Sequence, residues 1–378
     1  MPARVSLLRC NDYAAVPGVL SALLAPLGGM AAFVRPGQTV LLKPNLLTDA
    51  RPEQAVTTHP EVVRGLLRMV KAAGGIPVVG DSPANVADLE KVWEQSGFKS
   101  LCAEEGVALL NFEKAGSRHF ELRGVRFTIA QPVLDADVVI NVPKVKTHSF
   151  TILTAAVKNL YGTVPGFQKT DLHKQYPRPQ DFAAVVAAVY QTVRPALSVA
   201  DGVIALEGDG PSSGGSPMPL GILAASADAM ALDGVLCRLL GIPWQEVLYL
   251  AELARHGAGT GDTADIELAG DRITDRTPSR FRRPAAPMLR RIPLCLVRPL
   301  QPLIWTRPVF TARCVRCGQC VRACPTGAIC PDAERRPVLT PPKCIACCCC
   351  HEICPADAIV MTPSPLLRAV ARIRRVLR

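Results

Sequence analysis

Short apolar runs alternate with longer amphipathic segments along the first 271 residues. Runs rich in β-branched residues and bounded by Gly, Pro, Asn or Asp predict buried strands, and apolar residues spaced three and four apart predict helices. Strands are expected at 40–42, 76–79, 107–111, 137–141, 197–200, 220–225 and 266–268. Helices are expected at 58–73, with Thr58 as the N-cap, and at 87–105, 181–193, 227–240 and 243–256. This alternation predicts an α/β domain, in which a parallel or mixed sheet is covered by helices on both faces.

Polar side chains follow several of the expected strands directly. Lys43 and Asn45 come after the first strand, Asp81 comes after the second, and a polar loop follows 137–141 and leads into a helix. Because ligands of open α/β sheets lie beyond the carboxyl ends of strands, we expect these residues to meet in one pocket. Each of them alone would be interpreted as a solvated loop charge, and it is their clustering that favours a site.

The residue types in this cluster suggest roles. Lysines favour a ligand that carries a carboxylate or phosphate group, and a histidine beside carboxylates suits proton transfer. The substrate-binding candidates are Lys43, Asn45, Asp81, Lys146, Lys158 and Asn159, and the catalytic candidates are His148, Lys144, Asp201 and Glu207. His148 is the candidate proton donor, and Asp201 or Glu207 is the candidate base. The glycine-rich stretch 207–215 matches neither a Walker A loop nor a dinucleotide-binding fingerprint.

Charge divides the chain into unlike parts. The net charge is +11, but residues 1–271 hold 23 basic against 27 acidic side chains, while the remainder holds 20 against 5. Residues 272–312 are rich in arginine and proline and are expected to form a linker, since dense proline prevents regular elements. Residues 363–378 predict a basic amphipathic tail, which lies either on an anionic membrane surface or on a protein surface.

Eleven of the 15 cysteines lie between Cys314 and Cys354, within residues 313–362. The pattern C-x2-C-x2-C-x3-C-P occurs there twice, 30 residues apart, which indicates an internal duplication around a local two-fold axis. Zinc ribbons use two C-x2-C pairs and need neither a third cysteine two residues on nor the C-P pair. The spacing therefore favours iron–sulfur clusters over zinc.

This segment closely resembles bacterial two-cluster ferredoxins, in which the fourth cysteine of each run binds the other cluster. The resemblance implies a small α+β ferredoxin-like domain with two [4Fe–4S] clusters. One would be held by Cys314, Cys317, Cys320 and Cys354, and the other by Cys344, Cys347, Cys350 and Cys324. Cys348 and Cys349 depart from the pattern and leave open which thiols in the run of four bind the cluster.

The remaining cysteines are expected to be structural. Cys330 stands opposite Val360 in the repeat and is expected in the core of the domain. The four cysteines outside the repeat lie among apolar neighbours and are expected to be small buried hydrophobic residues, namely Cys10, Cys102, Cys237 and Cys295.

The first part of the chain is similar to the family called domain of unknown function 362. The motifs that carry the similarity are Lys43-Pro44-Asn45, Gly80-Asp81-Ser82-Pro83, Asn141 to His148, Ala156-Val157-Lys158-Asn159 with Gly162, and Asp201-Gly202. The similarity covers roughly residues 35–270, and members of that family often carry an appended ferredoxin module. Because the family label implies no settled reaction, the resemblance bears on architecture more than on chemistry.

These features predict an iron–sulfur oxidoreductase, in which two clusters relay electrons to or from a small anionic substrate or cofactor bound by the α/β domain of residues 1–271. The alternative is a non-catalytic ferredoxin-type electron carrier or assembly subunit, with the α/β domain as a docking scaffold. A redox partner protein is expected in either case. Nucleic-acid binding is disfavoured, because the arginines are interleaved with proline and apolar residues and no aromatic platform accompanies them.

The sequence also suggests a compartment. The first residues lack the basic start, apolar run and cleavage site of a secretory signal, and no run of about 18 apolar residues occurs. We therefore expect a cytoplasmic protein with reduced cysteines, which contacts membranes peripherally if the tail binds lipid.

Overall fold

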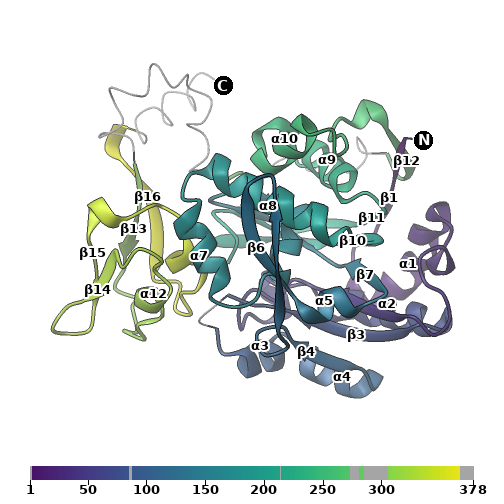
Figure 1. Ribbon diagram of the computed structural model, residues 1–378, viewed down its shortest axis with the longest axis horizontal. Helices are drawn as coiled ribbons and strands as arrows, with labels where there is room; N and C mark the ends of the chain where they lie inside the picture. Colours follow the sequence, from purple (N-terminus) through teal and green to yellow (C-terminus); the bar gives the residue numbers. More distant parts are fainter. Residues whose placement is uncertain (1, 85–86, 213, 273–280, 285–304, 367–378) are drawn as a thin grey trace.

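The computed structural model describes residues 2–84, 87–212, 214–272, 281–284 and 305–366 (Figure 1). Within these ranges the centre of the body is a mixed sheet of ten strands, ordered β12-β1-β11-β10-β7-β2-β3-β4, with β8 added beside β10 and β9 beside β8. The strands are β1 (Ala3–Arg9), β2 (Thr39–Lys43), β3 (Ile76–Asp81), β4 (Ala108–Asn111), β7 (Val138–Asn141), β8 (Lys144–His148), β9 (Ile152–Thr154), β10 (Leu197–Gly208), β11 (Gly215–Ser226) and β12 (Ile266–Gly270). The predicted α/β fold with a parallel or mixed sheet is confirmed.

The sheet separates two apolar layers. Successive side chains of a strand point to opposite faces, so Val40 and Leu42 pack in one layer and Leu41 packs in the other. The first layer is covered by α1 (Val16–Leu24), α2 (Pro60–Ala72), α3 (Leu89–Gln95) and α4 (Phe98–Glu105). The second is covered by α6 (Ala156–Asn159), α8 (Pro179–Val193), α9 (Ala229–Leu239) and α10 (Leu248–Arg255).

Parallel pairing brings several strand ends to one edge of the sheet. β2 runs parallel to both β3 and β7, and its Lys43 lies opposite Asn141. β10 runs parallel to β7 and then to β8, which places Asp201 opposite Lys144. The polar residues that follow β2, β3 and β7 are therefore carried to the same edge, as the sequence predicts.

The structure corrects several details of the sequence-based elements. The expected helix 87–105 is divided into α3 and α4 at Gly97, whose φ of 79° favours glycine. The side chain of His59, not that of Thr58, caps α2 by accepting from Glu61 N. The helix expected at 243–256 is a 3-10 turn (Trp244–Glu246) followed by α10.

Other elements had no strong local signal. β1 and the hairpin of β5 (Ser117–Leu122) and β6 (Val125–Ala130) were not expected, and β10 and β11 are each 12 residues long, well beyond the expected 197–200 and 220–225. The expectation of a polar loop after 137–141 is wrong for residues 144–148, because they form the buried strand β8.

The cysteine-rich segment forms a small α+β module at one end of the body, beside α7 (Gln168–Gln175) in Figure 1. β13 (Thr306–Phe310) pairs with β16 (Ile359–Pro363), and β14 (Ile329–Pro331) pairs with β15 (Pro337–Leu339). Two short helices lie between them, α12 (Gln319–Arg322) and α13 (Cys349–Glu352).

The backbone of the module repeats with the sequence. Positive φ angles recur at positions 30 residues apart: 57° at Arg316 and 52° at Ala346, then 72° at Gly318 and 67° at Cys348. Such angles are uncommon outside glycine, so their repetition indicates that both halves wrap the same kind of loop.

Most of the linker expected at 272–312 and almost all of the expected tail lie outside the described residues. The described piece 281–284 packs on the body: Phe281 contacts the second apolar layer, and the backbone N–H of Gly208 donates to Arg282 O at 2.8 Å. The domain boundaries themselves stay a prediction.

Candidate functional site

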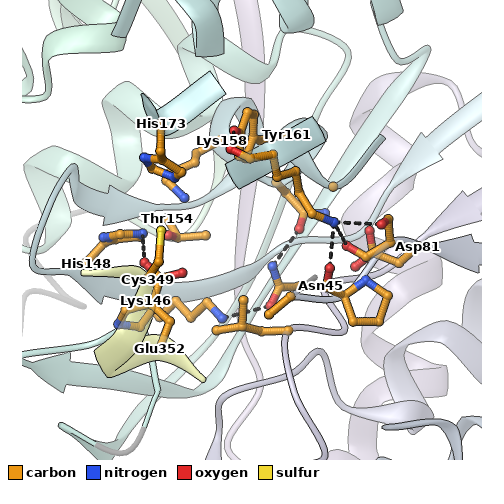
Figure 2. A pocket seen from close by; sticks show the side chains of 18 of the residues that line it. Asn45, Asp81, Lys146, His148, Thr154, Lys158, Tyr161, His173, Cys349 and Glu352 are labelled. Carbon is orange, nitrogen blue, oxygen red and sulfur yellow. Dashed lines mark hydrogen bonds and ion pairs between the residues drawn. The ribbon is translucent and has the colours of Figure 1, made fainter. Parts of the chain in front are cut away.

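A cavity lies where the body meets the cysteine-rich module. The centre of a water molecule can occupy a volume of about 90 Å³ inside it, which suits a small ligand. Six of the residues named from the sequence line it: Asn45, Asp81, Lys146, His148, Lys158 and Asn159. Figure 2 shows that the module contributes two more side chains, Cys349 and Glu352, on the opposite side from Asp81.

β8 explains why two of these residues reach the cavity together. Residues 144, 146 and 148 share one face of the strand because side chains alternate, and the strand is buried along its length. Lys146 and His148 line the cavity. Lys144, nearer the start of the strand, pairs with Asp201 instead.

Lys146 is positioned by a chain of side-chain amides. Asn159 Nδ2 donates to Asn141 Oδ1 at 2.8 Å, Asn45 Nδ2 donates to Asn159 Oδ1 at 2.9 Å, and Lys146 Nζ donates to Asn45 Oδ1 at 2.8 Å. Lys146 Nζ also donates to Val56 O at 2.6 Å. The ammonium group is thereby fixed at the wall of the cavity by neutral oxygens.

Basic side chains outnumber acidic ones in the cavity wall, which holds three lysines and two carboxylates. Lys146 is almost fully buried, and Lys158 Nζ lies 5.8 Å from the centre of the Tyr161 ring. No carboxylate among the described residues forms an ion pair with either lysine. Burial lowers the pKa of both ammonium groups, and that of Lys146 falls well below its usual value. An anion would relieve this cost, because a buried charge is stable only when it is paired.

His148 is held in a defined tautomer. Its Nδ1 accepts from the backbone N–H of Phe150 at 3.0 Å, so the proton of the neutral ring is on Nε2. Nε2 lies 3.2 Å from Glu352 Oε1. Burial, with Lys158 nearby, lowers the pKa of His148 to about 4, so the ring is neutral near pH 7 and presents an N–H group on the cavity side.

Glu352 is an acidic group that the module brings to the body. Burial acts to raise its pKa, but the neighbouring His148 and Lys158 lower it to about 2. It is therefore ionised near pH 7 and accounts for one negative charge beside the two lysines. The 3.2 Å contact of its Oε1 with His148 Nε2 does not have the geometry of a hydrogen bond, so Oε1 has no hydrogen-bond partner among the described residues.

Among the neutral side chains of the cavity wall, two polar atoms lack hydrogen-bond partners within the described residues. They are Thr154 Oγ1 and His173 Nδ1, in side chains that are only 3% and 7% exposed. The His173 ring stacks on Phe182 with 4.1 Å between ring centres, and burial lowers its pKa to about 3. Buried polar atoms are normally hydrogen-bonded, so two orphans in one cavity indicate that a ligand or water completes them.

The other predicted body residues do not line the cavity. Lys43 lies behind Asp81, with Nζ 2.7 Å from Oδ1, and the pair is buried against Gly162, where any Cβ would lie 2.2 Å from Asp81 Oδ1. Glu207 accepts from Arg282 Nε at 2.8 Å and from the Arg282 backbone N at 2.8 Å. The expectation that the strand-end candidates meet in one pocket is therefore wrong for Lys43 and Lys144, and Glu207 lies outside the cavity as well.

Lys144 and Asp201 form a separate buried network, in which both side chains are 0% exposed. Lys144 Nζ donates to Asp201 Oδ2 at 2.9 Å and to the Tyr13 hydroxyl at 2.9 Å. Asp201 also accepts from Tyr13 Oη at 3.1 Å and from His59 N at 2.9 Å. The structure assigns this pair to the packing of the body beside the cavity, and a catalytic role for it stays a prediction.

Several cavity residues escaped the sequence analysis. Lys169 Nζ donates to Ser82 O at 2.7 Å and to Ser82 Oγ at 2.6 Å, and burial lowers its pKa to about 8. His173 and Lys169 lie on or beside α7, far along the chain from any predicted strand end. The Gly80-Asp81-Ser82-Pro83 motif was the one local signal that pointed to Ser82.

The eight predicted cluster ligands divide between two cavities in the module. One is lined by Cys314, Cys317, Cys320 and Cys354, and the other by Cys324, Cys344, Cys347 and Cys350. Backbone N–H groups of Ala328 and Ala358 donate to Cys324 Sγ and Cys354 Sγ, each at 3.2 Å. Hydrogen bonds to sulfur stabilise a cluster-bound thiolate.

These cysteines fit iron–sulfur clusters better than a single ion. Within the described ranges, no three His, Cys, Asp or Glu side chains converge closely enough to hold one metal ion. A cubane cluster is bound at its corners, so its ligands surround a space instead of meeting at a point. Each quartet surrounds a space of this kind.

The extra cysteines have distinct positions. Cys348 takes the place of Gly318 in the repeat and is buried. It belongs to the second apolar layer and also lines the cavity of the second cysteine quartet. Cys330 is exposed, so the expectation that it belongs to the core is wrong; it lies on the edge hairpin β14–β15, as Val360 lies exposed on β16. Cys10, Cys102 and Cys237 are buried as expected, and Cys295 lies outside the described residues.

His351 fastens the module to the body. Its Nε2 lies 3.0 Å from Asp209 O and its Nδ1 lies 2.7 Å from Ile359 O within the module. Gly214 leaves room for the ring, since a Cβ there would lie 2.5 Å from His351 Cε1. This close contact fixes Cys349 and Glu352 at the cavity.

Comparisons with known proteins agree with this organisation. A family model described as Domain of unknown function (DUF362) matches residues 40–238, and one described as 4Fe-4S binding domain matches residues 308–330. A protein of Synechocystis sp. described as thylakoid-associated is 38% identical over 260 residues, which are 68% of this chain and 80% of that protein.

One solved structure shows a distant likeness to this chain. It is described as the lactate racemase apoprotein from Thermoanaerobacterium thermosaccharolyticum, and it is 11% identical, with a TM-score of 0.41 over 61% of this chain and 56% of that chain. The chain thus spans little more than half of that structure's length. In the described part of this chain, every helix is too short or too polar to cross a membrane.

Proposed function

The chain belongs to the family described as Domain of unknown function (DUF362) and is an iron–sulfur protein, and we propose that it is an oxidoreductase that exchanges electrons between two [4Fe–4S] clusters and a small anionic ligand. One observation carries this proposal: the cavity is lined both by lysines of the body and by residues of the module that adjoin Cys350. A ligand there would lie next to the loop that binds the second cluster.

The residues divide the work of binding and proton transfer. Lys146 and Lys158 bind the anion, since neither has a carboxylate partner in an ion pair among the described residues. His148 presents its Nε2–H group on the same side as a hydrogen-bond donor. It transfers a proton only from the imidazolium form, because loss of the proton from the neutral ring would leave an imidazolate. Clusters of this type, when bound, supply single electrons at low potential.

The number of clusters is part of the proposal. The family model covers the first cysteine run, and the second run supports a second cluster through its equal spacing, its repeated backbone angles and its separate cavity. A redox partner protein is likewise proposed, because electrons must enter or leave. Membrane contact through 363–378 stays a prediction of the sequence, since that tail lies almost wholly outside the described residues.

Anion binding tests the proposal most directly. The full-length protein, with clusters assembled anaerobically, would be titrated with oxalate and inorganic phosphate by calorimetry, with neutral oxamide as the matched control. Lys146→Met should weaken anion affinity by about tenfold or more, because a hydrogen bond to a charged group contributes roughly 1.5–3 kcal/mol. The exposed Lys114→Met variant should bind like the unchanged protein.

The redox part has its own readout. Iron analysis should give roughly eight atoms per chain if both cysteine quartets hold clusters. The electron paramagnetic resonance spectrum of the reduced protein should change when oxalate binds, and Lys146→Met should abolish that change. Anion binding that leaves the spectrum untouched, or no anion binding at all, would favour the electron-carrier alternative.

A further inference from the structure

Cys349 lies next to the proposed ligand Cys350 in the chain and its thiol contacts that of Cys347, but it lines the body cavity. In the 30-residue repeat it stands opposite Gln319, whereas Cys344, Cys347 and Cys350 match the ligands of the first run. The cavity of the second cysteine quartet is lined by Cys347 and Cys350 but not by Cys349. Figure 2 shows its sulfur on the side of the body cavity, between His148 and Thr154.

The body cavity carries independent signs of a ligand. Thr154 Oγ1 and His173 Nδ1 are buried in its wall without hydrogen-bond partners among the described residues. His173 belongs to α7 and Thr154 to β9, so the two orphans come from separate elements of the body. A thiol on the opposite wall would face any molecule that satisfied them.

The charges around Cys349 select the kind of molecule. Lys146 and Lys158 lack ion-pair carboxylates among the described residues, while Glu352 supplies the one acidic group on the side of the module. A small carboxylate would therefore be held by its charged end at the lysines, with its remaining atoms directed towards the module. The limited volume of the cavity admits only a few heavy atoms beyond that carboxylate.

We propose that Cys349 is the reactive thiol of this cavity and forms a sulfur–carbon bond to an electrophilic carbon of a small carboxylate held by Lys146 and Lys158. The inference rests on the anion binding proposed above and extends it to a substrate class: carboxylates conjugated to a polarised C=O or C=C bond. Among the side-chain types of the cavity wall, a thiol is the strongest nucleophile towards carbon once it is deprotonated, and Cys349 lies beside the loop of the second cluster.

The step balances without another reactant. The sulfur–carbon bond forms as the π bond of the substrate breaks, and the electron pair of that bond moves to the oxygen or to the far carbon. That atom takes up the proton that the thiol gives up. The net change is addition of S–H across a double bond, so no oxidant, reductant or leaving group is required.

Alkylation with a charged and a neutral reagent tests this assignment. Iodoacetate is a small carboxylate with an electrophilic carbon, and iodoacetamide is its neutral counterpart. With either reagent a sulfur–carbon bond forms, iodide leaves with the electrons of the carbon–iodine bond, and the thiol proton passes to solvent. The full-length, cluster-loaded protein would be treated briefly with each, and the modified peptides measured by mass spectrometry. Cys330, which is exposed in the same module, is the internal control.

We expect the ratio of iodoacetate to iodoacetamide modification to be about tenfold or more higher at Cys349 than at Cys330, in line with the charged contact assigned to the lysines. Lys146→Met should remove most of that difference, and phosphate should protect Cys349 but not Cys330. Cys349→Ser should keep the iron and sulfide content of the unchanged protein.

Two results would overturn the inference. Loss of iron in Cys349→Ser, or a Cys349 that resists both reagents until the clusters are removed, would make it a cluster ligand. If Cys349 shows no preference for iodoacetate while phosphate and oxalate still bind by calorimetry, the inference fails and the proposed anion site stands. If anion binding is absent as well, both fail.

Discussion

Variants of the Lys144–Asp201 pair can distinguish a structural role of these residues from a catalytic one. Replacement of Asp201 by asparagine keeps the size of the side chain but removes its charge. Lys144 would then lose its anionic partner and keep only neutral acceptors, the amide oxygen of residue 201 and the Tyr13 hydroxyl at 2.9 Å, in a position that is 0% exposed. We therefore expect Asp201→Asn to lower the stability of the body and to leave the affinity of the cavity for anions nearly unchanged.

The size of the effect follows from the burial of both groups. Removing one partner of a buried ion pair costs about 3–5 kcal/mol, because the other charge is left uncompensated. Asp201 also accepts from His59 N at 2.9 Å, and the amide keeps only part of the acceptor capacity of the carboxylate. For a domain of this size, that loss corresponds to a fall in the unfolding temperature on the order of 10 °C.

Thermal unfolding at one fixed heating rate, followed by circular dichroism of the cluster-loaded protein, measures this change. Lys144→Met/Asp201→Asn is the matched double variant, since replacing both charges of a buried pair is often close to neutral. The double variant should unfold at a higher temperature than Asp201→Asn alone, with a favourable coupling of up to about 3 kcal/mol. Calorimetric titration with oxalate should give similar affinities for the double variant and the unchanged protein.

One pattern of results would refute this reasoning. If Asp201→Asn unfolds at nearly the same temperature as the unchanged protein and yet loses oxalate binding, the pair acts on the ligand. The assignment of Lys144 and Asp201 to catalysis, made from the sequence, would then be preferred to the structural one.

Two further predictions concern buried residues near the cavity. Burial lowers the pKa of His173 from 6.5 to about 3. Between these two values the unfolded chain binds a proton at this histidine and the folded chain does not, so the free energy of unfolding should fall as the pH falls from 6.5 towards 3. His173→Phe should reduce the pH dependence of the free energy of unfolding, measured by thermal unfolding at pH 5–7, by up to about 1.4 kcal/mol per pH unit. A change of the exposed His119 should leave that dependence as it is. The same pH dependence in His173→Phe as in the unchanged protein would contradict the burial argument. Cys348→Gly should keep the iron content and change stability by less than about 1 kcal/mol, because relief of the left-handed φ of 67° offsets the lost packing; loss of iron would instead make Cys348 a ligand.

The sequence alone determined the features that are local in the chain. Cysteine spacing indicated iron–sulfur clusters and a duplication, because three thiols two residues apart wrap one tight loop, and apolar periodicity indicated the α/β body. The division of the ligands into two quartets came from the resemblance to two-cluster ferredoxins. Residues that directly follow β2 and β3, such as Asn45 and Asp81, were also found, since the end of a strand fixes the position of its next residues.

Only the tertiary structure decided which polar residues share the cavity. Residues 144–148 read as a polar loop, but their pairing with β10 and β9 makes them a buried strand, and that pairing depends on residues far away in the chain. Glu352 and Cys349 gave no local signal for the site, because they reach His148 only when His351 fastens the module to the body. Local spacing fixes local geometry, whereas contacts between distant segments arise from packing, which no short pattern encodes.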